Sequence, residues 1–341
     1  MIVCLGDIHL RDDKPYYVKT CEAFLDWFEH WELNNPHNSL ILTGDLVEKN
    51  LLTGKVAMYL ERLISTSRFN MIYICVGNHD IKNIQGETQL AYAFFKLKSN
   101  VKVYEEATEV TIEGHDVLMM PHFNGTNKLG MTMNDYYSSL YQNKGFKCNY
   151  ELLVGHFSLG DQIFDSSSDH ITDIDKLNAR KLCLGHIHTR GINPEHYIGS
   201  VFAGKKGEND YTRSAWVFDG KSWTEERLPV FNEFLQVTYP NELPKSNAMI
   251  PIYTVLNCAS EAVAKDFYGD IYIRKTTLDL LDSSAGKNSE DYFDERVNSI
   301  RGMNMMDAFV RFLETQNINI SENGREECLA ILKKKQDTLM N

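Results

Sequence analysis

The chain has 341 residues, of which 43% are hydrophobic and 24% charged, and its formal net charge is −12 at pH 7. This size suits one large α/β domain with one or two smaller ones, and no apolar run is long enough to predict a transmembrane helix. The negative charge argues against a protein that holds nucleic acid by its overall charge, although local basic patches or a partner can still supply that affinity.

The first residues, MIVCLGDIHL, lack the basic and apolar regions of a signal peptide. The seven cysteines are scattered and form no CxxC motif. Cys4, Cys75 and Cys183 lie inside apolar runs, which is typical of buried thiols in a reducing compartment. We therefore expect reduced cysteines and a cytoplasmic location.

The first third of the chain alternates apolar runs with helical patterns. The apolar runs are MIVCLGD, SLILTGD and NMIYICVGN. Between them, two sets of apolar residues follow helical spacing. The first set is Val18, Cys21, Leu25, Phe28 and Trp31, and the second is Val56, Leu60, Leu63 and Ser67. This order predicts a parallel sheet that helices cover on both faces.

The middle of the chain predicts hairpins and two further apolar strands. TEVTIEGHDVLMM predicts a hairpin around residues 113–116, and AWVFDGKSWTEERL predicts a second hairpin with Asp219-Gly220 at the turn. YELLVGH and KLCLGHIH are apolar runs that end in Gly-His, and the polar residues 161–175 between them predict a loop.

The C-terminal third predicts a small domain, a linker and two helices. We expect residues 1–228 to form the main domain. Residues 229–281 carry three strand patterns and one helical pattern, which predicts a small α+β domain. Residues 282–291 have the composition of a linker, and 292–341 predict two short amphipathic helices. Such helices need a partner surface or the main domain to bury their apolar faces. The apolar positions that we expect to bind a partner are Met306, Phe309, Val310, Leu313, Ile331 and Leu332.

Five apolar runs end in residues that can bind metal. In chain order these endings are Asp7-x-His9, Gly44-Asp45, Gly77-Asn78-His79-Asp80, Gly155-His156 and Gly185-His186-x-His188. Ligand sites of open α/β sheets form beyond the carboxyl ends of the strands, so we expect the five segments to converge.

The ligand set predicts two metal ions. Its seven members are Asp7, His9, Asp45, Asn78, His156, His186 and His188, which are too many for one ion. Asp45 is the natural bridging carboxylate, because it is the one carboxylate that stands alone in the middle of the set. Two bridged ions clamp a phosphoryl group and activate the attacking water. The imidazoles favour Mn²⁺, with Mg²⁺ as the alternative.

The five strand endings, taken in chain order, resemble the motifs of the calcineurin-like metallophosphoesterases over about residues 1–205. The resemblance implies a β-sandwich flanked by helices. It also implies that Asp7, His9, Asp45 and His188 hold one ion, while Asp45, Asn78, His156 and His186 hold the other. By the same analogy His79 contacts the scissile phosphate or the leaving oxygen, where it stabilises charge or donates a proton. Asp80 is expected to orient His79 or its loop.

The arrangement of the whole chain resembles the SbcD-type DNA-repair and recombination nucleases, most closely the short phage type. This resemblance implies DNA as substrate, with 229–281 as a capping domain on the DNA side. It also implies that the terminal helices bind an SbcC-type ATPase of the SMC-like class. A homodimer within a heterotetramer, located in the host cytoplasm if a phage encodes the protein, would follow from the same resemblance.

Several features leave alternatives open. Many relatives have a histidine that helps to handle DNA shortly after the GD motif, and Glu48 stands there in this chain. His122 either lines the cleft or is an ordinary histidine, while Arg190, Lys205 and Lys206 either contact phosphates or belong to a solvated loop. At the level of function, the alternatives to a nuclease are a phosphoesterase for a non-DNA substrate and a non-catalytic scaffold for the ATPase.

Overall fold

The computed structural model describes residues 1–34, 38–50, 52–65, 67–84, 87–122, 133–147, 149–160, 170–171, 177–190 and 194–277. The chain divides into two units, residues 1–278 and 279–341. The predicted linker and the predicted partner-binding residues Met306, Phe309, Val310, Leu313, Ile331 and Leu332 lie outside the described residues.

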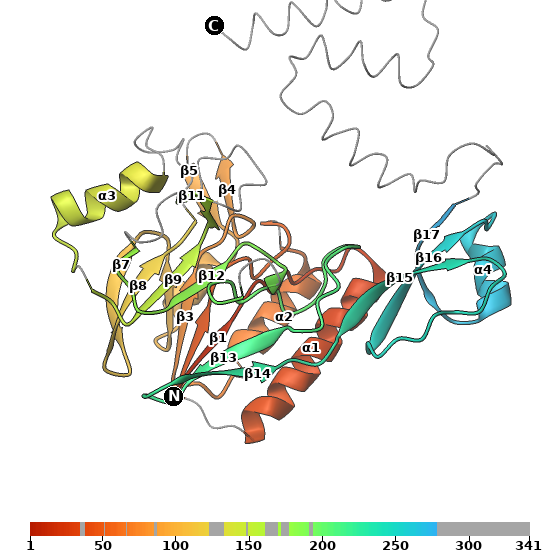
Figure 1. Ribbon diagram of the computed structural model, residues 1–341, viewed down its shortest axis with the longest axis horizontal. Coiled ribbons are helices and arrows are strands. Elements are labelled where there is room, and N and C mark those ends of the chain that lie inside the picture. The colour runs from red at the N-terminus through yellow and green to blue at the C-terminus, as the bar shows by residue number, and fades with distance from the viewer. Residues whose placement is uncertain are drawn as a thin grey trace, which may run out of the picture. The chain divides into compact units, whose positions relative to one another are not determined.

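A six-stranded sheet forms the first layer of β-structure (Figure 1). In spatial order its strands are β14 (Trp223–Arg227), β13 (Ser214–Phe218), β1 (Ile2–Leu5), β2 (Ser39–Leu42), β3 (Met71–Cys75) and β6 (Val101–Tyr104). β1, β2, β3 and β6 are parallel, and β13 and β14 add an antiparallel hairpin at one side. Because the parallel strands come from one chain, each connection between them must cross over, and helices make two of these crossings.

The central strands β1, β2 and β3 are buried on both faces. Val3 and Leu5 pack into a cluster with the helices α1 (Pro15–Asn34) and α2 (Gly54–Ser65), while Ile2 and Cys4 point to the opposite face. Successive side chains of a strand alternate between faces, so a run of uniformly apolar residues fits a sheet that is covered on both sides.

A four-stranded sheet packs against the opposite face of the first. Its strands, in spatial order, are β12 (Leu182–Gly185), β9 (Leu152–His156), β8 (His115–Met120) and β7 (Thr108–Ile112). Met119 and Val154 join Ile2 and Cys4 in the cluster between the sheets. On its outer face, α3 (Met133–Lys144) contributes to a separate cluster that contains Leu153. The main body is therefore a sandwich of two sheets between helices.

Short elements complete the main body. They are the 3-10 helix η1 (Ala93–Leu97) and two small strand pairs, β4 (Ile81–Ile84) with β5 (Glu87–Leu90) and β10 (Ser158–Leu159) with β11 (His170–Ile171). Both predicted hairpins are confirmed, since β7 pairs with β8 around Glu113 and β13 pairs with β14 around Gly220.

A small three-stranded sheet follows the main body. Its strands β15 (Asn232–Thr238), β16 (Ile250–Leu256) and β17 (Tyr272–Thr277) are parallel, and α4 (Glu261–Tyr268) connects the last two. The Ser260 hydroxyl caps α4 by accepting a hydrogen bond from the Val263 amide. Tyr16 and Tyr17 of α1 pack with Phe234 of β15, so this sheet has an apolar contact with the main body.

Three sequence expectations can be compared directly with these elements. The three apolar runs of the first third form β1, β2 and β3, which are parallel neighbours in one sheet, as predicted, but helices cover only one face of that sheet because the other face packs against the four-stranded sheet. The expectation that Ser67 belongs to the second helix is wrong, because α2 ends at Ser65. Cys4, Cys75 and Cys183 are buried free thiols, as predicted. Among the described helices, none has the length and apolar character needed to cross a membrane.

Candidate metal centre

Polar residues of both sheets meet where five strands end. In chain order they are Asp7 and His9 after β1, Asp45 after β2, Asn78, His79 and Asp80 after β3, His156 at the end of β9, and His186 and His188 after β12. The amide of His186 donates a hydrogen bond of 2.8 Å to Asp7 Oδ1, which joins the two sheets at this edge. The structure thus brings all seven predicted ligands together, in two adjoining groups.

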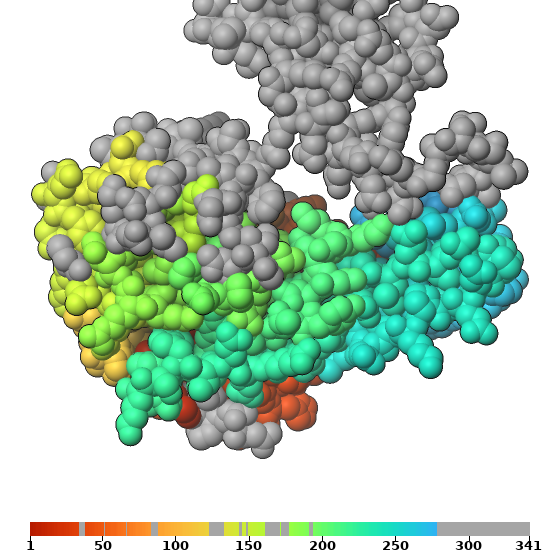
Figure 2. All heavy atoms as spheres, in the orientation of Figure 1, coloured from red at the N-terminus to blue at the C-terminus, as the bar shows by residue number. Residues whose placement is uncertain are grey.

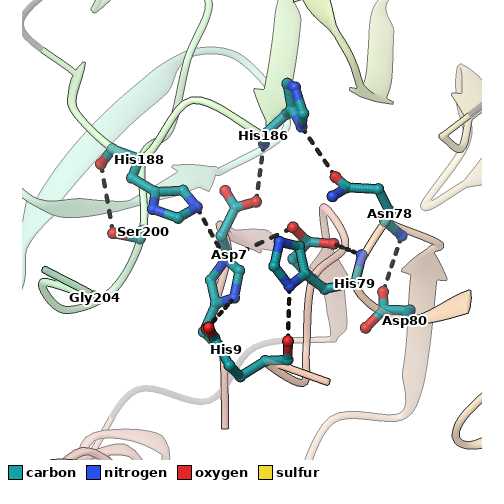
Figure 3. A network of polar contacts seen from close by, with 12 residues as sticks. Asp7, His9, Asn78, His79, Asp80, His186, His188, Ser200 and Gly204 are labelled. Carbon is teal, nitrogen blue, oxygen red and sulfur yellow. Dashed lines mark hydrogen bonds and ion pairs between the residues drawn. The ribbon is translucent and has the colours of Figure 1, made fainter. Parts of the chain in front are cut away.

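The first group consists of Asp7, His9, Asp45 and His188, whose nearest donor atoms all lie within 4.8 Å of one another. His9 Nε2 is 3.0 Å from His188 Nε2 and 3.6 Å from Asp45 Oδ2. Figure 3 shows the rings of His9 and His188 turned toward each other. Two carboxylates and two imidazoles at this spacing form a possible site for a divalent cation.

The second group lies around Asn78. Its Oδ1 atom is 3.0 Å from His156 Nε2 and 3.0 Å from His186 Nδ1. Asp45 Oδ2 lies 3.3 Å from His156 Nε2, so the Asp45 carboxylate is within contact distance of histidines from both groups. This is the position that a bridging carboxylate requires.

The described side chains of the centre fit positive ions, because buried acceptor atoms face one another or have no donor among the described residues. His156 Nδ1 lies 2.8 Å from the Thr43 carbonyl oxygen, which can only accept, so Nδ1 carries the proton. In the neutral ring, His156 Nε2 is then an acceptor that faces Asp45 Oδ2. Asp7 Oδ2 is buried and accepts no hydrogen bond from any described residue. A cation among these atoms would supply the missing partner.

The pKa shifts of two buried side chains, Asp45 and His156, lead to the same conclusion. Burial raises the pKa of the Asp45 carboxyl, but the nearby histidines, His156 foremost, together outweigh burial and hold that pKa well below its usual range. Burial lowers the pKa of His156, but Asp45, Asp7 and the Thr43 carbonyl together outweigh burial and raise that pKa well above the usual value. The pair retains positive charge beside the carboxylate, and a divalent cation can replace the proton that provides it.

Three residues of the centre adopt the left-handed backbone conformation. The φ angles of His9, Asp45 and His186 are 50°, 48° and 81°. Such angles are uncommon for residues other than glycine and cluster at functional sites. The Asp45 carbonyl accepts hydrogen bonds from the amides of Ile8 and His9, which fixes the first two of these turns against each other.

Gly77 allows the closest approach in the centre. A Cβ atom added at this position would lie 2.2 Å from Asp45 Oδ1 and 2.4 Å from the Asp45 amide nitrogen. No side chain fits in that space without displacing the Asp45 carboxylate.

His79 is held by its main chain and by one ring nitrogen. Its amide donates to Asp45 Oδ1 at 2.8 Å, and its Nδ1 lies 2.7 Å from the Glu48 carbonyl oxygen. Because a carbonyl only accepts, Nδ1 carries a proton and Nε2 is available to accept or deliver another. The ring is half-buried, which suits a group that meets a substrate at the surface.

Asp80 binds the loops of the centre and not the His79 ring. Its Oδ1 accepts hydrogen bonds from the Leu46 and Val47 amides at 2.8 and 3.3 Å, and its Oδ2 accepts one from the Gly77 amide at 2.9 Å. The carboxyl group is fully buried. Asp80 therefore joins the loops that follow β2 and β3, and it has no surface on which to contact a substrate.

Sequence reasoning missed Glu208 and left the role of Glu48 open, and both carboxylates lie beside histidines of the first group. Glu208 Oε1 lies 3.1 Å from His188 Nδ1, and Glu48 Oε2 lies 3.1 Å from His9 Nδ1, although the His9 contact is not aligned as a hydrogen bond. Glu48 also lies 3.3 Å from Arg11 Nη1. The signal that could have pointed to such residues is chemical, since metal-binding histidines usually donate their second N–H to a carboxylate or a carbonyl.

The structure decides the alternative that was left open for Arg190 and shows where His122 lies. Arg190 is only 3% exposed, and its guanidinium binds the Ser214 hydroxyl at 2.8 Å and Glu225 at 2.6 Å, so it does not contact phosphates. His122 lies beside the centre, with its ring centroid 6.4 Å from that of His156. Burial, together with the nearby His156 and His186, lowers the pKa of His122 to about 3.

Comparison with known proteins identifies a family. The sequence pattern of the calcineurin-like phosphoesterases matches residues 1–190, which is more than half of the chain and includes every residue of the two groups. A comparison with curated proteins found no match.

Two solved structures are similar in part. One is described as a novel archaeal phosphodiesterase, with 12% sequence identity and a TM-score of 0.35 over 67% of this chain and 99% of that one. The other is a protein of unknown function from Aquifex aeolicus, with 15% identity and a TM-score of 0.25 over 45% of this chain and 76% of that one. Likenesses at this level carry no argument about function.

Proposed function

Because this chain belongs to the calcineurin-like phosphoesterase family, we propose that its metal centre hydrolyses phosphodiester bonds in DNA. The observation that carries the proposal is the position of Asp45 between two groups of metal-binding side chains. The nuclease is proposed to work as a subunit of a complex with an SbcC-type ATPase, in recombination, repair or DNA-end processing.

Two divalent ions, which we propose to be Mn²⁺, are assigned to the two groups. Asp7, His9, Asp45 and His188 would hold one ion, and Asp45, Asn78, His156 and His186 would hold the other. When bound, such ions neutralise the charge of a phosphate and activate water for attack on phosphorus.

His79 is the proposed catalytic residue of the protein itself. The Glu48 carbonyl oxygen keeps the Nδ1 proton in place, so proton exchange occurs at Nε2. When protonated there, the ring can stabilise the charge of a phosphate oxygen or protonate the leaving oxygen. Asp80 is a positioning residue, because its carboxyl group fixes the loops that carry Asp45 and His79.

A polymeric substrate is favoured by the small sheet β15–β17, which packs against the main body at Tyr16 and Tyr17. A second lobe of this kind can give an extended substrate a further surface. The net charge of −12 makes strong DNA binding by this chain alone unfavourable, which is the reason to assign part of the DNA affinity to the ATPase.

The proposal is tested by the release of nucleotides from end-labelled linear duplex DNA in Mn²⁺, with and without an SbcC-type ATPase. Wild type is compared with His79→Ala, which should lower the rate by about 10²- to 10⁴-fold, the range of general acid–base catalysis. His30→Ala is a matched control, because His30 lies on α1 and contacts the Asp26 carbonyl of the same helix.

The outcomes separate three functions. Cleavage that requires both Mn²⁺ and His79 supports the nuclease. Hydrolysis of a generic aryl phosphodiester without any cleavage of DNA, even with the ATPase present, indicates another substrate. Absence of all hydrolysis favours a scaffold, and DNA cleavage that survives His79→Ala contradicts the role assigned to this residue.

A further inference from the structure

His188 is oriented by a buried carboxylate outside the predicted ligand set. Its Nδ1 lies 3.1 Å from Glu208 Oε1, and Glu208 is only 6% exposed. A carboxylate accepts hydrogen bonds and does not donate them, so the proton of the neutral His188 ring lies on Nδ1. The lone pair then lies on Nε2, the atom that faces His9 Nε2 at 3.0 Å in the first group. Glu208 thus selects the form of His188 that can bind a metal.

The polypeptide around Glu208 holds the carboxylate in place. Glu208 Oε2 accepts a hydrogen bond of 2.8 Å from the Gly204 amide. The Glu208 carbonyl binds the guanidinium of Arg213, which also binds Ser200. The Ser200 amide in turn donates to the His188 carbonyl at 3.1 Å. Glu208 and His188 are therefore connected through both their side chains and their main chains. Rotation of the Glu208 side chain would break its contacts with His188 and with the Gly204 amide.

The first strand of the small sheet holds both ends of the segment that contains Glu208. The Asn232 side chain accepts from the Ala203 amide and donates to the Ala203 carbonyl, each at 2.8 Å. The Asn209 side chain does the same with Phe234, at 2.9 and 2.8 Å. Figure 2 shows the green residues near 200 continuing into the teal and cyan surface of the small sheet. β15 thereby supports residues 203–209 on both sides of Glu208.

We propose that Glu208 is a positioning residue for the metal ligand His188, and that β15 holds it in position through Asn209 and Asn232. This inference rests on the proposed metal centre, but not on DNA as the substrate. It connects the small sheet to one metal site through four named side chains.

The test is Mn²⁺ binding to the full chain, measured by titration calorimetry and by the electron paramagnetic resonance of free Mn²⁺. Glu208→Ala should weaken one of two sites by about 10- to 100-fold, as the loss of a partner behind a ligand does. Glu208→Gln should lie between wild type and Glu208→Ala, because its amide oxygen can still accept from His188. Asn209→Ala should weaken the same site by about 2- to 30-fold. Glu261→Gln, on α4 beside Lys265, is the charge-matched control.

A second measurement, by nuclear magnetic resonance, shows directly which nitrogen of the His188 ring carries the proton. In metal-free protein labelled with nitrogen-15 histidine, His188 should have its proton on Nδ1 in wild type and on a mixture of both nitrogens in Glu208→Ala. Two sites of unchanged affinity in Glu208→Ala would overturn the inference, even if the variant is less stable. Absence of any Mn²⁺ binding in wild type would remove the proposed metal centre itself, and the inference with it. Weakened binding in a chain that does not cleave DNA would support the inference while contradicting the proposed substrate.

Discussion

His9 Nε2 and His188 Nε2 lie 3.0 Å apart, although 179 positions separate the two residues in the chain. His9 follows a strand of the six-stranded sheet, and His188 follows a strand of the four-stranded sheet. Two ring nitrogens at this distance either share a proton or face a common cation. Asp7 and Asp45 lie beside them, so a single cation could bind all four side chains.

Asp45→Asn should impair both metal sites, because Asp45 Oδ2 approaches His9 at 3.6 Å and His156 at 3.3 Å. We expect two Mn²⁺ ions per chain in wild type and fewer in the variant. The loss of phosphoesterase activity should exceed the roughly 10- to 100-fold that substitution of an outer partner costs. Equilibrium dialysis followed by metal analysis gives the stoichiometry.

Two single-site variants provide the comparison for Asp45→Asn. His188→Ala should remove the ion of the first group only, and His186→Ala that of the second group only. An Asp45→Asn protein that retains two tightly bound ions would contradict the bridging position of Asp45.

Removal of metal should lower the stability of the main body. Asp7 and Asp45 are buried carboxylates, and a cation that binds only the folded chain stabilises it by mass action. At a free Mn²⁺ concentration 100 times the dissociation constant, one site contributes about 2.7 kcal/mol. Thermal unfolding followed by circular dichroism should therefore show a lower Tm in EDTA than in Mn²⁺. The difference should largely disappear in Asp45→Asn, and an equal difference in both proteins would place the stabilising ion elsewhere.

Gly77→Ala should abolish activity, because the added Cβ would lie 2.2 Å from Asp45 Oδ1. Relief of that contact must move the loop after β3 or the Asp45 carboxylate, and either movement disturbs both groups. Gly54→Ala is the matched control, since a Cβ added there meets no atom within 4 Å. The control should retain full activity and gain up to about 1 kcal/mol of stability, because Gly54 begins α2. Measurements of hydrolysis and urea unfolding on both variants would check this, and an active Gly77→Ala would show that the loop can yield.

Much of the fold and of the centre follows from local patterns. The residues Cys21, Leu25 and Phe28 repeat at helical spacing and lie in α1, and the Asp219-Gly220 turn joins β13 to β14 as expected. The assignment of strands to sheets could not be predicted in this way. Residues 2–5 and 182–185 are both short apolar runs, and each is buried on both faces, so their composition does not reveal which sheet they join.

Glu208 marks a different limit of sequence reasoning. It lies in a polar segment, KKGEND, that has no periodic pattern, and its link to His188 depends on Arg213, Asn209 and Asn232. No short-range rule relates these positions to one another. The proposed metal ligands could be recognised in the sequence because each stands close to the end of an apolar run. Glu208, the proposed positioning residue, is placed by tertiary contacts.

Glu32 makes stability depend on pH at a position away from the metal centre. It lies near the C-terminal end of α1, where its Oε1 accepts a hydrogen bond of 2.8 Å from the Ser67 hydroxyl. Glu32 is only 6% exposed. Burial raises the pKa of the carboxyl to about 7 and outweighs the opposing effect of the hydrogen bond from Ser67. The negative end of the helix dipole also disfavours a charge at this position.

Glu32→Gln should therefore stabilise the protein at pH 8 but not at pH 4.5. In wild type the unfolded carboxyl ionises near pH 4.5 while the folded one remains neutral, so stability falls as the pH rises toward 7. The neutral amide avoids this loss, which is on the order of 1–3 kcal/mol. Urea unfolding of the variant and of wild type is measured in EDTA from pH 4.5 to 8. Subtracting the two free energies of unfolding removes the titration of the proposed metal ligands, which is the same in both proteins. Glu61→Gln should show no such rise from pH 5 to 8, because Glu61 is an exposed partner of Lys98 with a lowered pKa. Equal curves for Glu32→Gln and Glu61→Gln would mean that the Glu32 carboxyl ionises normally in the folded chain.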